Sequence, residues 1–178
     1  AKAAIKAIHE FHRNTGNPIP VMISGTIVDQ SGRTLSGQTT EAFWVSVSHT
    51  QNLLSVGLNC ALGSEQMRPF IENLSDIAHV FTSLYPNAGL PNELGEYEET
   101  PDFMARQVDE YASEGFINLV GGCCGSTPDH LQKIAEAAAK HAPRERPEKS
   151  PYMQLSGLEH LTIRPETNFV NVGERTNV

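Results

Sequence analysis

The sequence predicts an α/β fold made of parallel strand–helix units. Three observations lead to this prediction: apolar, β-branched runs alternate with stretches of helical spacing, each apolar run is continuous, and each run leads into a helix. Continuous apolar strands are typical of parallel sheets that are covered on both faces. Four such units fit either a doubly wound sheet or half of an eight-stranded barrel, and the pattern alone leaves both open.

The expected strands are the apolar runs at residues 19–28, 53–60, 79–88 and 116–122. The expected helices lie beside them, at residues 1–14, 39–50, 64–78, 100–115 and 128–142. Gly16 is the expected stop of the first helix. Before the second helix, the hydroxyl and amide groups of LSGQTTEAF either cap the helix or hold polar groups of a substrate, and capping is favoured.

The later helices carry start signals of their own. Ser64 is the expected N-cap of the third helix, and Pro69 inside its pattern predicts a kink or a break because proline lacks a backbone donor. Thr100, followed by proline at the first helical position, opens the fourth helix. Ser126 and Asp129 form a capping-box pattern ahead of the fifth helix.

The composition indicates a folded, soluble chain. It has 178 residues, of which 39% are hydrophobic and 19% charged, and it is long enough to bury a sizeable core. It contains no apolar run of about 18 residues and no signal-peptide pattern, so a cytoplasmic location is the default expectation. A net charge of −8 without a clustered basic face argues against nucleic acid and anionic membrane as partners.

Both ends of the sequence look cut from something longer. Residues 1–142 hold the predicted strand–helix units. Residues 143–168 are expected to form a linker, because the stretch PRERPEKSPYMQL is rich in proline and charge. Residues 169–178, FVNVGERTNV, are expected to begin the first strand of a further domain.

The three cysteines fall at the carboxyl ends of two predicted strands. Cys60 ends the second strand, and Cys123 and Cys124 follow the fourth within VGGCCG. Sites of parallel α/β folds form at this edge. Neighbouring residues of a strand point to opposite faces, so both thiols of the pair reach one point only where the backbone leaves strand geometry, which the flanking glycines permit. An odd number of cysteines is also a poor disulfide framework.

Three converging thiolates predict a metal site, and zinc suits soft sulfur ligands best. Three thiolates give a zinc site a net charge of about −1, which makes it a poor activator of water, whereas a fourth thiol would still bind and lose its proton. The site therefore suggests S-alkylation of a thiol substrate. Asn87, on the strand between the two ligand-bearing strands, is the candidate fourth ligand without substrate, with water as the alternative. The seven histidines are expected to be non-ligands, with His130 exposed on its helix.

The stretches GLNCALG, YPNAGLPN and GGCCGSTPDH resemble the homocysteine methyltransferase family. The resemblance implies the second half of a (βα)8 TIM-type barrel, with Cys60, Cys123 and Cys124 as the zinc ligands. Residues 169–178 look like the first strand of the pterin-binding domain that follows the barrel in cobalamin-dependent members. This likeness implies methylcobalamin and 5-methyltetrahydrofolate, each bound by a module that is absent from this chain.

Two classes of function remain open at this stage. In the first, zinc activates the thiolate of homocysteine, which accepts a methyl group to give methionine. The methyl donor is methylcobalamin, or betaine or S-methylmethionine as in cobalamin-independent relatives. In the second class the chain is not catalytic, and its cysteines hold a structural metal, which a fourth protein ligand should close off, or form a vicinal disulfide. With half of the barrel missing, the chain alone is expected to be inactive.

Overall fold

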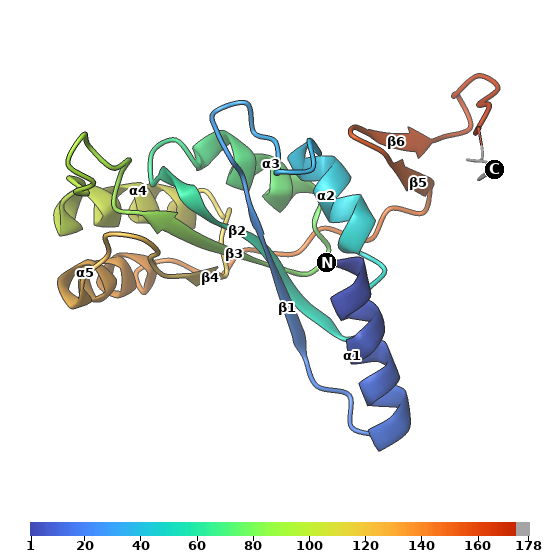
Figure 1. The fold of residues 1–178 in the computed structure, drawn as a ribbon, viewed down its shortest axis with the longest axis horizontal. Helices are drawn as coiled ribbons and strands as arrows, with labels where there is room; N and C mark the ends of the chain where they lie inside the picture. The colour runs from blue at the N-terminus through green and yellow to red at the C-terminus, as the bar shows by residue number, and fades with distance from the viewer. Residues whose placement is uncertain (174–178) are drawn as a thin grey trace.

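The computed structural model describes residues 1–173, and its strands form two sheets. The larger sheet is parallel, with the strand order β1 (Val21–Thr26), β2 (Leu53–Gly63), β3 (Phe81–Asn87) and β4 (Leu119–Val120). The helices are α1 (Lys2–Thr15), α2 (Thr40–Val47), α3 (Arg68–Ile77), α4 (Pro101–Ser113) and α5 (Pro128–Ala138). A separate antiparallel hairpin joins β5 (Met153–Ser156) to β6 (His160–Ile163) (Figure 1).

The order of the strands decides between the two predicted architectures. Each strand of the parallel sheet pairs with its neighbour in the sequence, so the sheet winds in one direction. A doubly wound sheet reverses its strand order in the middle, whereas a (βα)8 barrel adds its strands in sequence. The α/β prediction is confirmed, and the sheet is consistent with part of a TIM-type barrel. Within residues 1–173 the sheet stays open, with β1 at one edge and β4 at the other.

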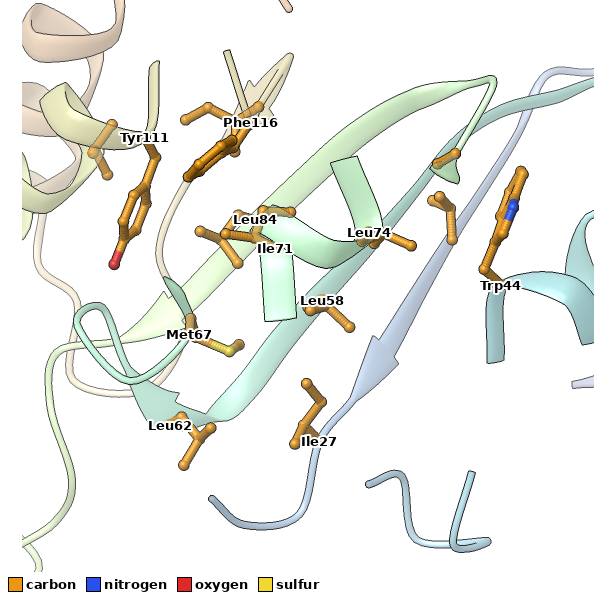
Figure 2. Packing of buried hydrophobic residues seen from close by; sticks show 14 of the residues in the cluster. Ile27, Trp44, Leu58, Leu62, Met67, Ile71, Leu74, Leu84, Tyr111 and Phe116 are labelled. Carbon is orange, nitrogen blue, oxygen red and sulfur yellow. The ribbon is translucent and has the colours of Figure 1, made fainter. Parts of the chain in front are cut away.

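The hydrophobic core lies between the sheet and its helices (Figure 2). Leu58 on β2 and Leu84 on β3 are fully buried, as are Ile71 and Leu74 on α3. Trp44 brings α2 into the same cluster. In Figure 1, α4 and α5 lie side by side over the other end of the sheet. None of the helices in the described part of the chain is both long and apolar enough to cross a membrane.

The other face of the sheet is open and becomes polar toward the carboxyl ends of the strands. On β1, Val21 and Gly25 are buried, whereas Met22, Ser24 and Thr26 are exposed. The Ser24 hydroxyl donates to Asn59 Oδ1 on β2 at 2.6 Å. This is the face that would line the inside of a barrel, since the helices cover the opposite face.

Two of the expected helix starts are confirmed. The Thr39 hydroxyl accepts a hydrogen bond from the backbone N–H of Ala42 at 3.2 Å, so LSGQTTEAF does cap α2. The Thr100 hydroxyl accepts one from the backbone N–H of Phe103 at 3.3 Å, at the start of α4. At the other end of α1, Gly16 has a φ of 66°, as expected of a glycine that ends a helix.

The other two start predictions are wrong. Helix α3 begins at Arg68 rather than after Ser64, and Pro69 lies in its first turn, where the missing N–H has no partner to lose, so it causes no kink. The N-cap of α5 is Thr127 rather than Ser126. This choice places Pro128 at the first helical position, where its fixed φ suits the helix.

The segment expected to be a linker carries structure of its own. Its hairpin packs on α2: the Ser156 hydroxyl donates to the carbonyl of Ala42 at 2.6 Å, and the Thr39 backbone N–H donates to the carbonyl of Leu158 at 3.0 Å. Of the strand expected at residues 169–178, residues 169–173 form no regular secondary structure, and residues 174–178 lie outside the described part of the chain.

Candidate metal centre

The structure brings the three cysteines together. Their sulfur atoms all lie within 4.8 Å of one another. The Sγ of Cys124 lies 3.5 Å from that of Cys60 and 4.0 Å from that of Cys123. Within residues 1–173, no His, Asp or Glu side chain joins this group. The thiols are free, and Cys124 is exposed to solvent.

A bulge at the end of β2 aims Cys60 toward the pair. Cys60 and Ala61 have φ angles of 60° and 63°, in the left-handed region that costs a non-glycine residue about 1–2 kcal/mol. The pairing of β2 with β3 shifts at this point and resumes where Gly63 meets Asn87. Two successive residues keep this strained conformation only because the surrounding structure holds them in place.

The other two cysteines lie on the loop between β4 and α5. Gly125 has a φ of 78°, which lets the chain turn into the helix directly after Cys124. Gly122 serves a different need, since a Cβ there would overlap the Ser126 side chain. The chain leaves strand geometry after Val120, as the sequence predicted, and of Gly121, Gly122 and Gly125 only Gly125 has a positive φ.

Backbone hydrogen bonds fix this loop against β3. The backbone N–H of Cys123 donates to the carbonyl of Pro86 at 2.8 Å. The backbone N–H of Cys124 donates to Asn87 Oδ1 at 3.1 Å, and the carbonyl of Cys124 accepts from the N–H of Ala88 at 2.9 Å. The Asn87 side chain is buried and borders the cysteine cluster. The amide oxygen of Asn87 therefore lies close to the cluster. Such a position is required both of a fourth ligand and of a residue that holds the cysteines in place.

The surroundings shift the pKa values of the Cys60 and Cys123 thiols in opposite directions. Burial acts to raise the pKa of the Cys60 thiol, but hydrogen bonds from the Ala61 backbone, the other two thiols and Asn87 outweigh it, and the pKa lies below its ordinary value. Burial, and then the hydrogen bond to Cys60, raises the pKa of Cys123 to about 11. In the metal-free protein Cys60 is therefore the thiol that deprotonates more readily of the two.

Several residues near the centre were missed by the sequence analysis. The loop between β3 and α4 places Tyr97 beside Cys124; burial, and then this thiol, raises the pKa of the phenol. The same loop carries Glu99, whose carboxylate binds Ser64. The expectation that His130 is exposed is wrong, since its ring is buried against Thr127 and the carbonyl of Glu99. Position in a loop at the carboxyl edge of the sheet was the available signal for Tyr97 and Glu99.

The sulfur atoms suit a tetrahedral zinc ion. With Zn–S bonds of about 2.3 Å, the sulfurs of such a site lie about 3.8 Å apart. The separations of 3.5 and 4.0 Å lie on either side of this value. Three thiols, with no His, Asp or Glu side chain beside them among the described residues, leave one coordination position for a different ligand. The cysteine triad could therefore hold a metal.

The fold and the cysteines together define a parallel βα sheet with a cluster of three thiols, which could hold a metal, at its carboxyl edge. The family model for homocysteine S-methyltransferases matches residues 1–138. The match covers most of the chain, which therefore belongs to the homocysteine S-methyltransferase family. Homocysteine as substrate and methyl transfer as reaction are consistent with this membership.

Proposed function

We propose that this chain is the zinc-binding half of the homocysteine barrel of a cobalamin-dependent methionine synthase. Cys60, Cys123 and Cys124 hold the zinc ion, and homocysteine supplies a fourth sulfur. The methyl group comes from methylcobalamin, which receives it from 5-methyltetrahydrofolate. Residues 1–142 belong to the barrel, residues 143–168 link it to the next domain, and residues 169–178 begin a pterin-binding domain. Membership of the family supports the reaction, and the cysteine triad supports the metal.

One observation carries the proposal: three thiols converge, and no His, Asp or Glu side chain among residues 1–173 joins them as a fourth ligand. A bound zinc ion would supply the acidity that keeps a substrate thiol deprotonated. The chain's own residues hold that centre open toward solvent, because Cys124 is exposed and the sheet face beside it is polar. Before substrate binds, the side-chain oxygen of Asn87 or a water molecule fills the remaining position.

X-ray absorption at the zinc edge tests this proposal on the zinc-loaded chain. We expect three sulfur neighbours and one oxygen neighbour without substrate, and four sulfur neighbours after homocysteine is added. Homoserine, which has a hydroxyl in place of the thiol, is the matched control and should leave three sulfurs. A site that keeps the same ligands with and without homocysteine would instead indicate a structural metal.

The methyl donor needs a test of its own. The last ten residues support cobalamin, because FVNVGERTNV looks like the start of a pterin-binding domain. Methylcobalamin, betaine and S-methylmethionine should be offered in turn to the full-length polypeptide with homocysteine. We expect methionine from methylcobalamin alone. Turnover with betaine or S-methylmethionine would identify a cobalamin-independent homocysteine methyltransferase.

The alternative without catalysis predicts different chemistry. Oxidation of adjacent cysteines would join Cys123 to Cys124, whose sulfurs are now 4.0 Å apart, against about 2.05 Å in a disulfide. Forming that bond would remove two of the three metal ligands. Mass spectrometry of the protein from a reducing preparation distinguishes the two, since the proposal requires three free thiols and one bound zinc.

A further inference from the structure

Glu99 connects the two segments that carry the cysteines. Its carboxylate Oε2 accepts hydrogen bonds from the Ser64 hydroxyl at 2.6 Å and from the Ser64 backbone N–H at 3.2 Å. Its carbonyl accepts from His130 Nε2 at 2.8 Å. Its backbone N–H donates to the carbonyl of Ala88 at 3.0 Å. One residue of the loop before α4 is thereby bound to the ends of β2 and β3 and to α5.

The hydrogen bonds between Ser64 and the Glu99 carboxylate lie just after the strained bulge in the sequence. Cys60 and Ala61 hold left-handed backbone angles, and Ser64 follows them after two residues. The Glu99 carboxylate also occupies the space beside Gly63 that a side chain would fill. A strained conformation persists only where its surroundings fix it on both sides. Pairing with β1 fixes the chain before Cys60, and the carboxylate of Glu99 fixes it after the bulge.

The hydrogen bond between His130 and Glu99 ties down the segment that carries Cys123 and Cys124. His130 lies in the first turn of α5, five residues after Gly125, where the chain turns directly after Cys124. Its Nδ1 accepts from the backbone N–H of Thr127 at 3.2 Å, so its Nε2 carries the proton that it donates to the carbonyl of Glu99. The start of α5 is therefore tied to the same residue that holds the end of the bulge.

We propose that Glu99 is a positioning residue that keeps the Cys60 bulge and the Cys123–Cys124 loop at the spacing a metal requires. This inference rests on the proposed metal site but goes beyond it, because Glu99 is not a ligand. It predicts that the metal affinity of the chain depends on a carboxylate that never touches the metal. Residues that orient metal ligands from behind typically change metal affinity by about 10–100-fold when they are replaced.

Zinc affinity, measured by competition with a chromogenic chelator, tests the inference on the full chain. We expect Glu99→Ala to bind zinc about tenfold more weakly than the wild type. Glu99→Gln keeps an oxygen that can accept both Ser64 donors, so it should stay within about threefold. Glu98→Ala is the matched control, since Glu98 is the exposed neighbour of Glu99 and its carboxylate accepts from Asn92 at 2.8 Å rather than from Ser64.

A spectroscopic measurement separates positioning from general stability. Co²⁺ bound to thiolates gives a charge-transfer absorption that reports how many sulfurs coordinate it. We expect this band to be weaker for the folded Glu99→Ala protein at saturating Co²⁺, and unchanged for Glu99→Gln. Loss of stability alone would leave the spectrum of the folded fraction unaltered.

The outcomes distinguish this inference from the proposed function. If the wild-type chain takes up no zinc, the proposed metal site and the positioning role of Glu99 are both wrong. If the wild type binds zinc and Glu99→Ala binds it equally well, the positioning role alone is wrong. If Glu99→Ala does not fold, Ser64→Ala and His130→Phe carry the test, because the first removes the hydroxyl that binds the Glu99 carboxylate and the second removes the ring donor to the Glu99 carbonyl. Wild-type affinity and an unchanged Co²⁺ spectrum in both would then overturn the role of Glu99.

Discussion

The Sγ atoms of Cys60 and Cys124 lie 3.5 Å apart although 64 residues separate the two cysteines in the sequence. They come from the end of β2 and from the loop after β4, and β3 lies between these strands. A metal held by both would therefore connect two strands that have no hydrogen bonds to each other. The same geometry makes every one of the three thiols necessary, because no other Cys, His, Asp or Glu side chain among residues 1–173 joins the cluster.

Replacement of any one cysteine by serine should remove most of the metal. We expect about one zinc per wild-type chain, and much less in Cys60→Ser, Cys123→Ser and Cys124→Ser, because two sulfurs hold zinc far more weakly than three. Ser126→Ala is the control, since its hydroxyl lies in the same loop without a hydrogen-bond partner and its removal should leave the zinc content unchanged. Elemental analysis after dialysis measures the stoichiometry. Full zinc content in all three cysteine variants would refute the assignment.

A glycine at position 61 should stabilise the metal-free protein. Ala61 has a φ of 63°, which glycine adopts without steric cost, so Ala61→Gly should raise the free energy of unfolding by about 0.5–1 kcal/mol. Ala105→Gly, inside α4, should lower it by about 1 kcal/mol. Urea denaturation monitored by circular dichroism measures both. Equal losses in the two variants would show that the backbone at Ala61 is not strained.

The stability contributed by Tyr111 should depend on pH in the alkaline range. Its buried hydroxyl donates to the carbonyl of Ser64 at 2.6 Å, and burial raises its pKa above the ordinary value of about 10. Above pH 10 the unfolded chain releases this proton while the folded chain keeps it, so rising pH removes stability from the wild type. Tyr111→Phe should be less stable by about 1–2 kcal/mol at pH 7.

That difference should narrow by about 1 kcal/mol between pH 9 and pH 11, because phenylalanine has no proton to release. Urea unfolding at several pH values, with wild type and variant measured side by side, gives the difference directly. The two proteins differ at this one side chain, so the difference in unfolding free energy isolates its contribution. A difference that stays constant up to pH 11 would contradict the raised pKa of Tyr111.

Arg144 should be a strong contributor to stability although it lies in the segment that the sequence marks as a linker. Its buried guanidinium donates to the carbonyls of Ala78 at 2.6 Å, Val80 at 3.0 Å and Ser75. Arg144→Ala leaves these carbonyls without partners and should cost about 3 kcal/mol in urea unfolding. Arg144→Lys should recover little, because an ammonium lacks the planar fork.

Arg146→Ala is the control for this measurement. Arg146 is exposed and lies over the ring of Phe81 at 4.8 Å, so its loss should cost about 1 kcal/mol or less. Equal costs for Arg144→Ala and Arg146→Ala would show that the carbonyls around Arg144 find water instead. A larger cost for Arg144→Ala would show that this residue of the proposed linker packs against the strand–helix units.

The sequence was sufficient for the features that depend on local pattern. Continuous apolar runs located all four strands of the parallel sheet, and the N-cap threonines of α2 and α4 were recognisable from hydroxyl groups placed before a helical pattern. The cysteines could be placed at one edge because parallel strands end at the same edge. These predictions needed no knowledge of contacts between distant residues.

Features that depend on tertiary contacts could not be predicted. Ser64 looks like an N-cap, but its hydroxyl binds Glu99 and its carbonyl accepts from Tyr111, so α3 starts later. The left-handed backbone at Cys60 follows from strand pairing on both sides rather than from the residue type. His130 is buried because the carbonyl of Glu99 lies within reach, which no local pattern reports.

The position of β4 at the edge of the described sheet means that a bound metal would have a second effect. This strand pairs with β3 through only two residues, Leu119 and Val120, before the chain enters the cysteine loop. As an edge strand within residues 1–173, β4 can detach by breaking hydrogen bonds on one side alone, and detachment would expose the backbone on either side to cleavage. A metal joining Cys124 to Cys60 would hold that end of the sheet closed, in proportion to how tightly it binds. We therefore expect zinc supply to govern how long the chain survives a protease as well as what it does to a thiol.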